Sequence, residues 1–106
     1  MNTEIETAVF LHMAQSIFST AECDELAVFL AANPLAGDVI VGGQGLRKLR
    51  FARTGMGKRG GARVIYFNRL ESGVVVLLAC YAKAKFDNLS TDFLVKLKEK
   101  FDAKKT

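Results

Sequence analysis

The chain has few of the residues that metal centres and disulfide scaffolds require. Its 106 residues include two cysteines, one histidine, one proline and no tryptophan. These are too few ligands for an ordinary zinc site, and two cysteines do not make the scaffold found in small secreted proteins. We therefore expect no metal and no other cofactor. Cys23 and Cys80 are expected to be reduced thiols without a catalytic role.

Long hydrophobic runs are also missing. The longest unbroken apolar stretch, Val74 to Ala82, has nine residues, whereas a membrane-spanning helix needs about 20. The N-terminus has neither the cationic start nor the long apolar segment of a secretory signal. Half of the residues are apolar and a quarter are charged, which is typical of a globular protein. These features predict one domain, residues 1–106, located in the cytoplasm and without a membrane partner.

The two signs of charge are segregated along the chain. Residues 1–38 contain six acidic residues and no lysine or arginine. Like charges repel, so a segment that gathers cations without a counter-charge favours a polyanionic partner, most often nucleic acid. A solvated charged surface, balanced in space by the acidic segment, is the alternative. Residues 39–70 contain no acidic residue and eight basic ones: Arg47, Lys48, Arg50, Arg53, Lys58, Arg59, Arg63 and Arg69.

The hydrophobic pattern predicts an α+β fold with a small, mostly antiparallel sheet, two N-terminal helices and one C-terminal helix. The expected order is β-α-α-β-β-β-α. A short β-like run at 39–41 and a glycine-rich basic loop at 54–61 lie between these elements. The elements are a strand at 4–7, a helix at 8–16, a helix from the Ser19–Glu22 capping box to Pro34, strands at 46–53, 62–70 and 74–83, and a helix capped by Ser90 or Thr91.

Basic residues and a phenol recur on the predicted strands. Alternation places Lys48 and Arg50 on one face of their strand, and Tyr81 with Lys83 on one face of theirs. Alternation does not decide which face Arg63 takes. If these faces coincide, the set can cleave RNA by attack of a 2′-hydroxyl on the adjacent phosphorus, with cations stabilising the growing charge and lysine or tyrosine transferring protons. Nucleic-acid binding without catalysis is the alternative that these residue types leave open.

The glycines around Lys58 do not form the phosphate loop of a nucleotide hydrolase. Gly57-Lys58 is followed by Arg59, where the Walker A pattern needs serine or threonine, and then by a strand in place of a helix. A glycine-rich basic hairpin loop can still contact a phosphate backbone. We therefore predict that Lys58 and Arg59 contact RNA.

Several glycines and basic residues fall in an order and spacing that is typical of one protein family. They are Asn33-Pro34, Gly37–Ile40, Gly45–Arg50, Gly55, Gly57–Gly61 and Arg63–Tyr66, with Glu6-Thr7 and Phe10 before them and Leu77-Leu78 and Tyr81–Lys83 after them. The series resembles the HigB-type branch of the RelE/ParE toxin superfamily, over nearly the whole chain from residue 5 to residue 97. The resemblance implies a RelE-like fold and a toxin of a type II toxin–antitoxin pair.

The same resemblance implies an activity, partners and a site. Family members typically enter the ribosome and cut messenger RNA, which inhibits translation, and a cognate antitoxin with a helix-turn-helix domain usually binds them. By position, the catalytic basic residues of the family correspond to Lys48, Arg50, Arg63 and Lys83, with Tyr81 close by. The further residues that we expect to bind RNA are Arg47, Arg53, Lys58, Arg59, Lys85 and Phe86.

One departure from the family pattern follows Lys83. Relatives commonly continue with Asn-Glu, whereas this chain continues with Ala84-Lys85-Phe86. The change removes a carboxylate and supplies an aromatic ring that can stack on a base. The superfamily also contains inhibitors of DNA gyrase, whose clefts tend to lack the basic set. A non-catalytic, ParE-like gyrase inhibitor and a non-catalytic RNA-binding module are therefore the alternatives, and the cations favour the ribonuclease.

Overall fold

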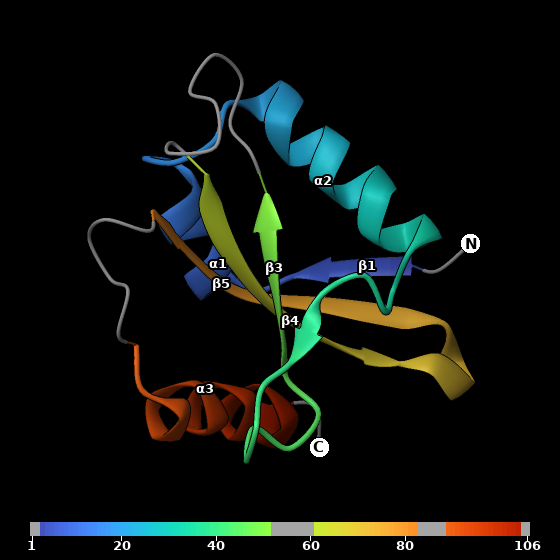
Figure 1. The fold of residues 1–106 in the computed structure, drawn as a ribbon, viewed down its shortest axis with the longest axis vertical. Coiled ribbons are helices and arrows are strands. Elements are labelled where there is room, and N and C mark those ends of the chain that lie inside the picture. The colour runs from blue at the N-terminus through green and yellow to red at the C-terminus, as the bar shows by residue number, and fades with distance from the viewer. Residues whose placement is uncertain (1–2, 52–60, 83–88, 105–106) are drawn as a thin grey trace.

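Three helices and a five-stranded sheet make up the α+β fold (Figure 1). The computed structural model describes residues 3–51, 61–82 and 89–104. A short 3-10 turn, Leu70–Ser72, joins the fourth and fifth strands. In chain order the elements are β1 (Thr3–Glu6), α1 (Ala8–Ala14), α2 (Thr20–Ala32), β2 (Asp38–Val39), β3 (Arg47–Phe51), β4 (Ala62–Arg69), β5 (Val74–Ala82) and α3 (Thr91–Lys104).

The strands lie in the order β1-β5-β4-β3-β2, which confirms a mostly antiparallel sheet. Only β1, which pairs with β5, is parallel to its neighbour among the described strands; the other three pairings are antiparallel. The long apolar run became β5, which lies inside the sheet and is buried along most of its length. The β-like run near residue 39 is a two-residue strand, β2, at the far edge.

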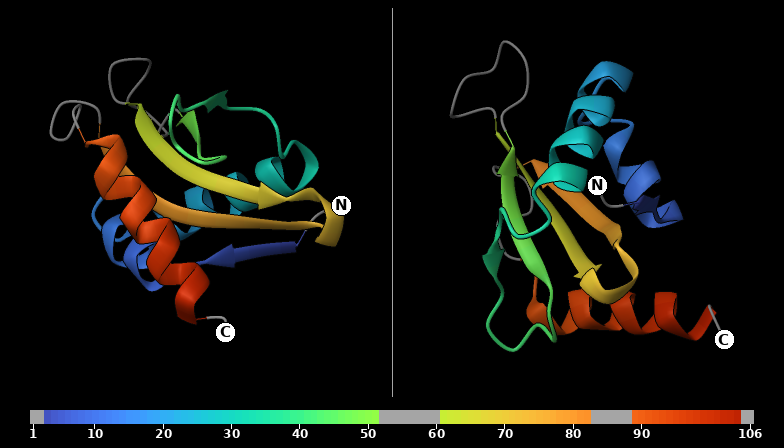
Figure 2. Two further views of the ribbon diagram at one scale, coloured as in Figure 1. Left: turned by 90° about the horizontal axis from the view of Figure 1, so that it is seen from below. Right: turned by 90° about the vertical axis from the view of Figure 1, so that its right-hand side faces the viewer.

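Helices cover both faces of the sheet (Figure 2). One hydrophobic core, here called the α1/α2-side core, contains Phe10, Leu26 and Leu30 of the helices together with Val64 and Leu77 of the strands. A second core, the α3-side core, lies on the opposite face and includes residues of α3, β4 and β5. Because β4 and β5 contribute alternate residues to both cores, they form the buried centre of the fold.

Hydroxyl groups at the first turns determine where the helices begin. The hydroxyl of Thr7 accepts a hydrogen bond from the N–H of Phe10 at 3.1 Å, which caps α1. The predicted capping box is confirmed, because Ser19 and Glu22 each accept a hydrogen bond from the other's backbone N–H. At α3 the hydroxyl of Ser90 accepts from the N–H of Phe93, so Ser90 is the cap.

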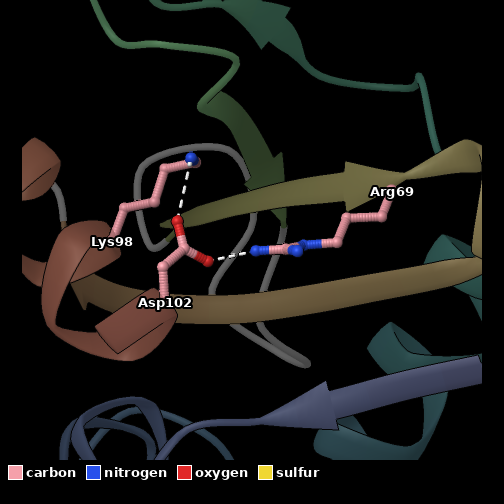
Figure 3. A network of polar contacts seen from close by, with 3 residues as sticks. All are labelled: Arg69, Lys98 and Asp102. Atoms are coloured by element: carbon pink, nitrogen blue, oxygen red, sulfur yellow. Dashed lines mark hydrogen bonds and ion pairs between the residues drawn. The ribbon is translucent and has the colours of Figure 1, made fainter. Parts of the chain in front are cut away.

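Polar contacts fasten the C-terminal half of α3 to the end of β4 (Figure 3). The carboxylate of Asp102 forms ion pairs with Arg69 of β4 and with Lys98, whose Nζ lies 3.3 Å away. Beneath them, the Phe67 ring lies 5.0 Å from the Lys98 ammonium and packs edge-on against Phe101. Arg69 is therefore a structural cation in the described part of the chain.

A β-bulge changes which face the last residues of β5 present. Ile65 pairs with Ala79, but the next residue of β4, Tyr66, pairs with Leu77, so Leu78 is an extra residue on β5. Both Leu78 and Ala79 lie in the α3-side core. Beyond the bulge the alternation is shifted by one residue, and Tyr81 therefore lies on the α3 side of the sheet.

Glu4 of β1 is a buried carboxyl group whose ionisation opposes folding. Both of its carboxyl oxygens are buried. Burial, together with the charge of Glu6, raises the pKa of Glu4 from its ordinary value of 4.5 to about 7, although the Ala31 backbone N–H offsets part of this rise. Since the folded pKa lies above the unfolded one, the stability is fully present below pH 4.5 and is lost as the pH rises through 7.

We therefore expect Glu4→Gln to raise the free energy of unfolding by about 1–2 kcal/mol near pH 8, a range discounted for partial solvent exposure. Near pH 4 the same change should have little effect, because the carboxyl group is then protonated in both states. Urea unfolding at the two pH values measures the difference. Glu25→Gln, on the exposed side of α2, is the matched control. Equal stability of wild type and Glu4→Gln near pH 8 would contradict the expectation.

Candidate functional site

Strand register brings three predicted site residues into one row across the sheet. Arg50 of β3 pairs with Arg63 of β4, and Arg63 pairs with Tyr81 of β5. Residues paired in this way project from the same face of a sheet, and that face carries the α3-side core. Lys48 lies two residues before Arg50 and therefore shares its face. The structure thus groups Lys48, Arg50, Arg63 and Tyr81, here called the basic row.

The basic row lies at the end of the sheet that is remote from the contacts of Phe67 and Arg69 with Lys98 and Asp102, here called the α3 anchor. It is formed where β3 ends, β4 begins and β5 ends (Figure 1). The contacts of Phe67 and Arg69 with α3 lie at the opposite end of β4. The ion pairs of Asp102 therefore do not neutralise the cations of the row.

Arg63 has hydrogen-bonding capacity that the fold does not use. Its side chain is half-buried, and its Nη1 atom is buried without a hydrogen-bond partner among the residues that the structure describes. Buried donors are ordinarily satisfied, since leaving one unpaired costs about 1–3 kcal/mol. Next to it in the row, Tyr81 is only 2% exposed and belongs to the α3-side core. The row therefore combines the guanidinium of Arg63, which has an unused hydrogen-bond donor, with the buried phenol of Tyr81.

Arg47 lies on the other face of β3 and has a structural role. Its guanidinium donates hydrogen bonds to the backbone carbonyls of Leu35 and Gly37, at 3.1 and 2.9 Å. The N–H of Gly37 in turn donates to the hydroxyl of the buried Tyr66 at 2.8 Å. A side chain at Gly37 would approach the carbonyl oxygen of Lys48 to 2.6 Å, so the turn needs glycine there. Arg47 therefore holds the turn against β3 and does not join the basic row.

The described part of the chain stops on both sides of the basic row. Phe51 at the end of β3 and Ala82 at the end of β5 pair with Ala62 from its two sides. The site residues that lie outside the described residues are Arg53, Lys58, Arg59, Lys83, Lys85 and Phe86.

The described residues offer neither an activated thiol nor a cluster of metal ligands. Burial raises the pKa of Cys80 to about 12, and burial with nearby carboxylates raises the pKa of Cys23. A thiol that stays protonated is a poor nucleophile. In residues 3–51, 61–82 and 89–104 no three His, Cys, Asp or Glu side chains group as metal ligands would. The described side chains of the basic row are those of arginine, lysine and tyrosine.

Two cavities open elsewhere on the described surface. A polar cavity of about 330 Å³ lies beside the α3 anchor, between Gln44, Asn68 and Lys98. An apolar groove of about 320 Å³ lies between β1, the start of α1 and α3. Neither cavity includes a residue of the basic row. No helix in the described part of the chain has the length and hydrophobicity that crossing a membrane requires.

The chain was compared with protein-family profiles and with solved structures. No protein-family profile matches the chain. Its structure is similar to that of a mutant of the E. coli toxin RelE in the free state, with a TM-score of 0.57 and 17% sequence identity. The match covers 77% of this chain and 83% of the RelE chain. The chain therefore has a RelE-like α+β fold, as the sequence resemblance predicted.

Proposed function

We propose that this protein is the HigB-type toxin of a type II toxin–antitoxin pair and that it cleaves messenger RNA on the ribosome. The observation that carries the proposal is the basic row, with Arg63 at its centre and a buried guanidinium nitrogen without a described partner. The RelE-like fold supports it. The cognate antitoxin, with a helix-turn-helix domain, is the proposed protein partner.

The proposed reaction uses the 2′-hydroxyl of the RNA as the nucleophile. Its oxygen attacks the adjacent phosphorus, the bond from phosphorus to the 5′-oxygen breaks, and the products are a 2′,3′-cyclic phosphate and a 5′-hydroxyl. The 2′-hydroxyl loses a proton and the departing 5′-oxygen gains one. Arg63 would donate hydrogen bonds to the non-bridging oxygens as their negative charge grows. Arg50 and Lys48 would stabilise the same charge electrostatically. Proton transfer is assigned to Tyr81 or Lys83.

The distribution of acidic residues supports a polyanionic substrate at the row. Glu22, Asp24 and Glu25 lie on α2, which packs on the sheet face opposite the basic row. Glu4 and Glu6 lie on β1 beside the first half of β5, whereas Tyr81 lies near the other end of β5. The acidic residues of α2 and β1 are thus set apart from Arg50, Arg63 and Tyr81, which keep their attraction for phosphate. Asp38 of β2 is the exception, since it pairs with Lys48 at the edge of the row.

Production of this protein without an antitoxin should arrest bacterial growth and cut transcripts within their translated regions. Cleavage requires the row, so an Arg63→Ala protein made at the same level should leave transcripts intact. Mapping of new RNA 5′ ends after induction, with untranslated RNAs as internal controls, measures the result.

The outcomes separate the alternatives. Growth arrest with intact transcripts and altered DNA supercoiling would identify a gyrase inhibitor in place of a ribonuclease. Normal growth with intact transcripts, at verified expression of folded protein, would contradict the toxin assignment. Cleavage of untranslated RNA to the same extent as translated RNA would contradict dependence on the ribosome.

A further inference from the structure

The first strand leaves one edge of the sheet free. β1 is the outermost strand next to β5, and no other described strand pairs with it. The N–H groups of Thr3 and Thr7 donate to the carbonyls of Gly73 and Leu77 on the β5 side. Because successive N–H groups of a strand point to opposite sides, those of Glu4 and Glu6 point to the free edge.

The apolar groove runs directly beside this edge. It has a volume of about 320 Å³, and most of its surface is hydrocarbon. Val9 in its wall is 39% exposed, so the groove leaves apolar surface in water. Its lining includes Ile5, Glu6, Val9, Leu78, Lys100 and Phe101.

The two sides of β1 differ in character. Glu4 and Glu6 pair with Val75 and Leu77, which belong to the α1/α2-side core, so their side chains lie on that side. Ile5 lies on the opposite side, toward the groove and α3. A strand added to this edge would therefore place alternate side chains beside the acidic residues and over the apolar groove.

We propose that the β1 edge and the groove together bind an extended segment of a protein partner in which basic and apolar residues alternate. The exposed Glu6 would attract the basic residues, and residues 1–38 contain no lysine or arginine to repel them. The apolar residues would enter the groove. This surface lies at the Val74–Leu77 half of β5, away from Tyr81, so the inference goes beyond RNA cleavage and does not depend on it.

Two other occupants fit the charges less well. A second copy of the chain would bring the acidic residues of two β1 edges together, and like charges on paired edge strands are destabilising. RNA would place phosphates beside Glu6 and would offer no apolar side chain to the groove. The acidic edge therefore favours a basic protein segment.

The test uses the full-length protein and a fluorescent eight-residue peptide of alternating lysine and valine, with an alternating glutamate and valine peptide as control. Titration is followed by fluorescence anisotropy at low salt. We expect the lysine peptide to bind and the glutamate peptide to bind at least tenfold more weakly. Glu6→Lys should lower the affinity for the lysine peptide at least tenfold. The matched charge change Glu25→Lys on α2 should alter that affinity less than threefold. Equal effects of the two substitutions would overturn the site.

A second comparison tests strand addition in particular. Glu6→Pro removes the charge and also the N–H that points to the free edge, whereas Glu6→Gln removes the charge alone. We expect the proline variant to bind the lysine peptide at least fivefold more weakly than the glutamine variant, with both shown to be folded by thermal melting. Bound peptide should also slow hydrogen exchange at the Glu4 and Glu6 amides. Equal binding by the two variants, or unchanged exchange at both amides, would overturn strand addition.

Discussion

Replacement of Arg63 by alanine should lower the single-turnover rate of mRNA cleavage on programmed ribosomes by about 100-fold or more, the usual cost of one charge-stabilising donor. Arg63 is the central member of the basic row, and its Nη1 has no partner among the described residues. A lysine keeps the charge but loses the two-pronged contact with phosphate oxygens. Arg63→Lys should therefore recover only part of the rate.

Rate and ribosome affinity must be measured on the same protein, with folding checked by thermal melting. Affinity should change far less than rate, because the other cations of residues 39–70 are still present. Arg69→Ala is a matched control, since it also removes one arginine of β4 but breaks the ion pair with Asp102 at the other end of the strand. It should keep the cleavage rate. A folded Arg63→Ala protein that cleaves at the parental rate would remove Arg63 from the mechanism.

Arg47→Met should destabilise the protein by about 2–3 kcal/mol, because a charged donor that binds two backbone carbonyls is lost while the apolar stem is kept. The carbonyls are those of Leu35 and Gly37, in the turn before β2. Urea unfolding measures the loss. The salt dependence of RNA binding should stay the same, because this guanidinium is already engaged on the face opposite the row.

Lys48→Met is the matched comparison, since Lys48 adjoins Arg47 in β3 but lies on the face of the row. It should change stability little and reduce the log–log slope of RNA affinity against salt by about one. The pair of variants thus distinguishes a cation of the fold from a cation of the site. If Arg47→Met instead lowered the slope by one and left stability unchanged, Arg47 would be an RNA contact.

The basic row and the β1 edge with its groove are two separate surfaces of the structure. The basic row lies at one end of β3, β4 and β5, whereas Glu6 and the apolar groove lie beside β1. A partner bound along β1 would leave the row uncovered. The proposed catalytic surface and the proposed docking surface can therefore be tested by independent substitutions.

The elements whose causes are local could be predicted from the amino-acid sequence. The capping box of Ser19 and Glu22 is made within four residues of chain, and the apolar run after Gly73 has to be buried on both faces. These features predicted the helix starts, the internal position of β5 and the α+β class. They indicated a β-like run at 39–41 but did not count β2 among the strands, because two residues are too few to show alternation. They also could not choose between Ser90 and Thr91 as the cap of α3.

The grouping of particular cations with a phenol depends on the pairing of distant strands and could not be predicted. The face of Arg63 follows from its pairing with Arg50 and Tyr81, and pairing depends on hydrogen bonds between strands that are distant along the chain. The bulge at Leu78 shifts the alternation of β5 by one residue, so the face of Tyr81 could not be counted from the start of the strand. Arg47 and Lys48 are adjacent in sequence, yet their opposite faces assign one to the turn and the other to the basic row.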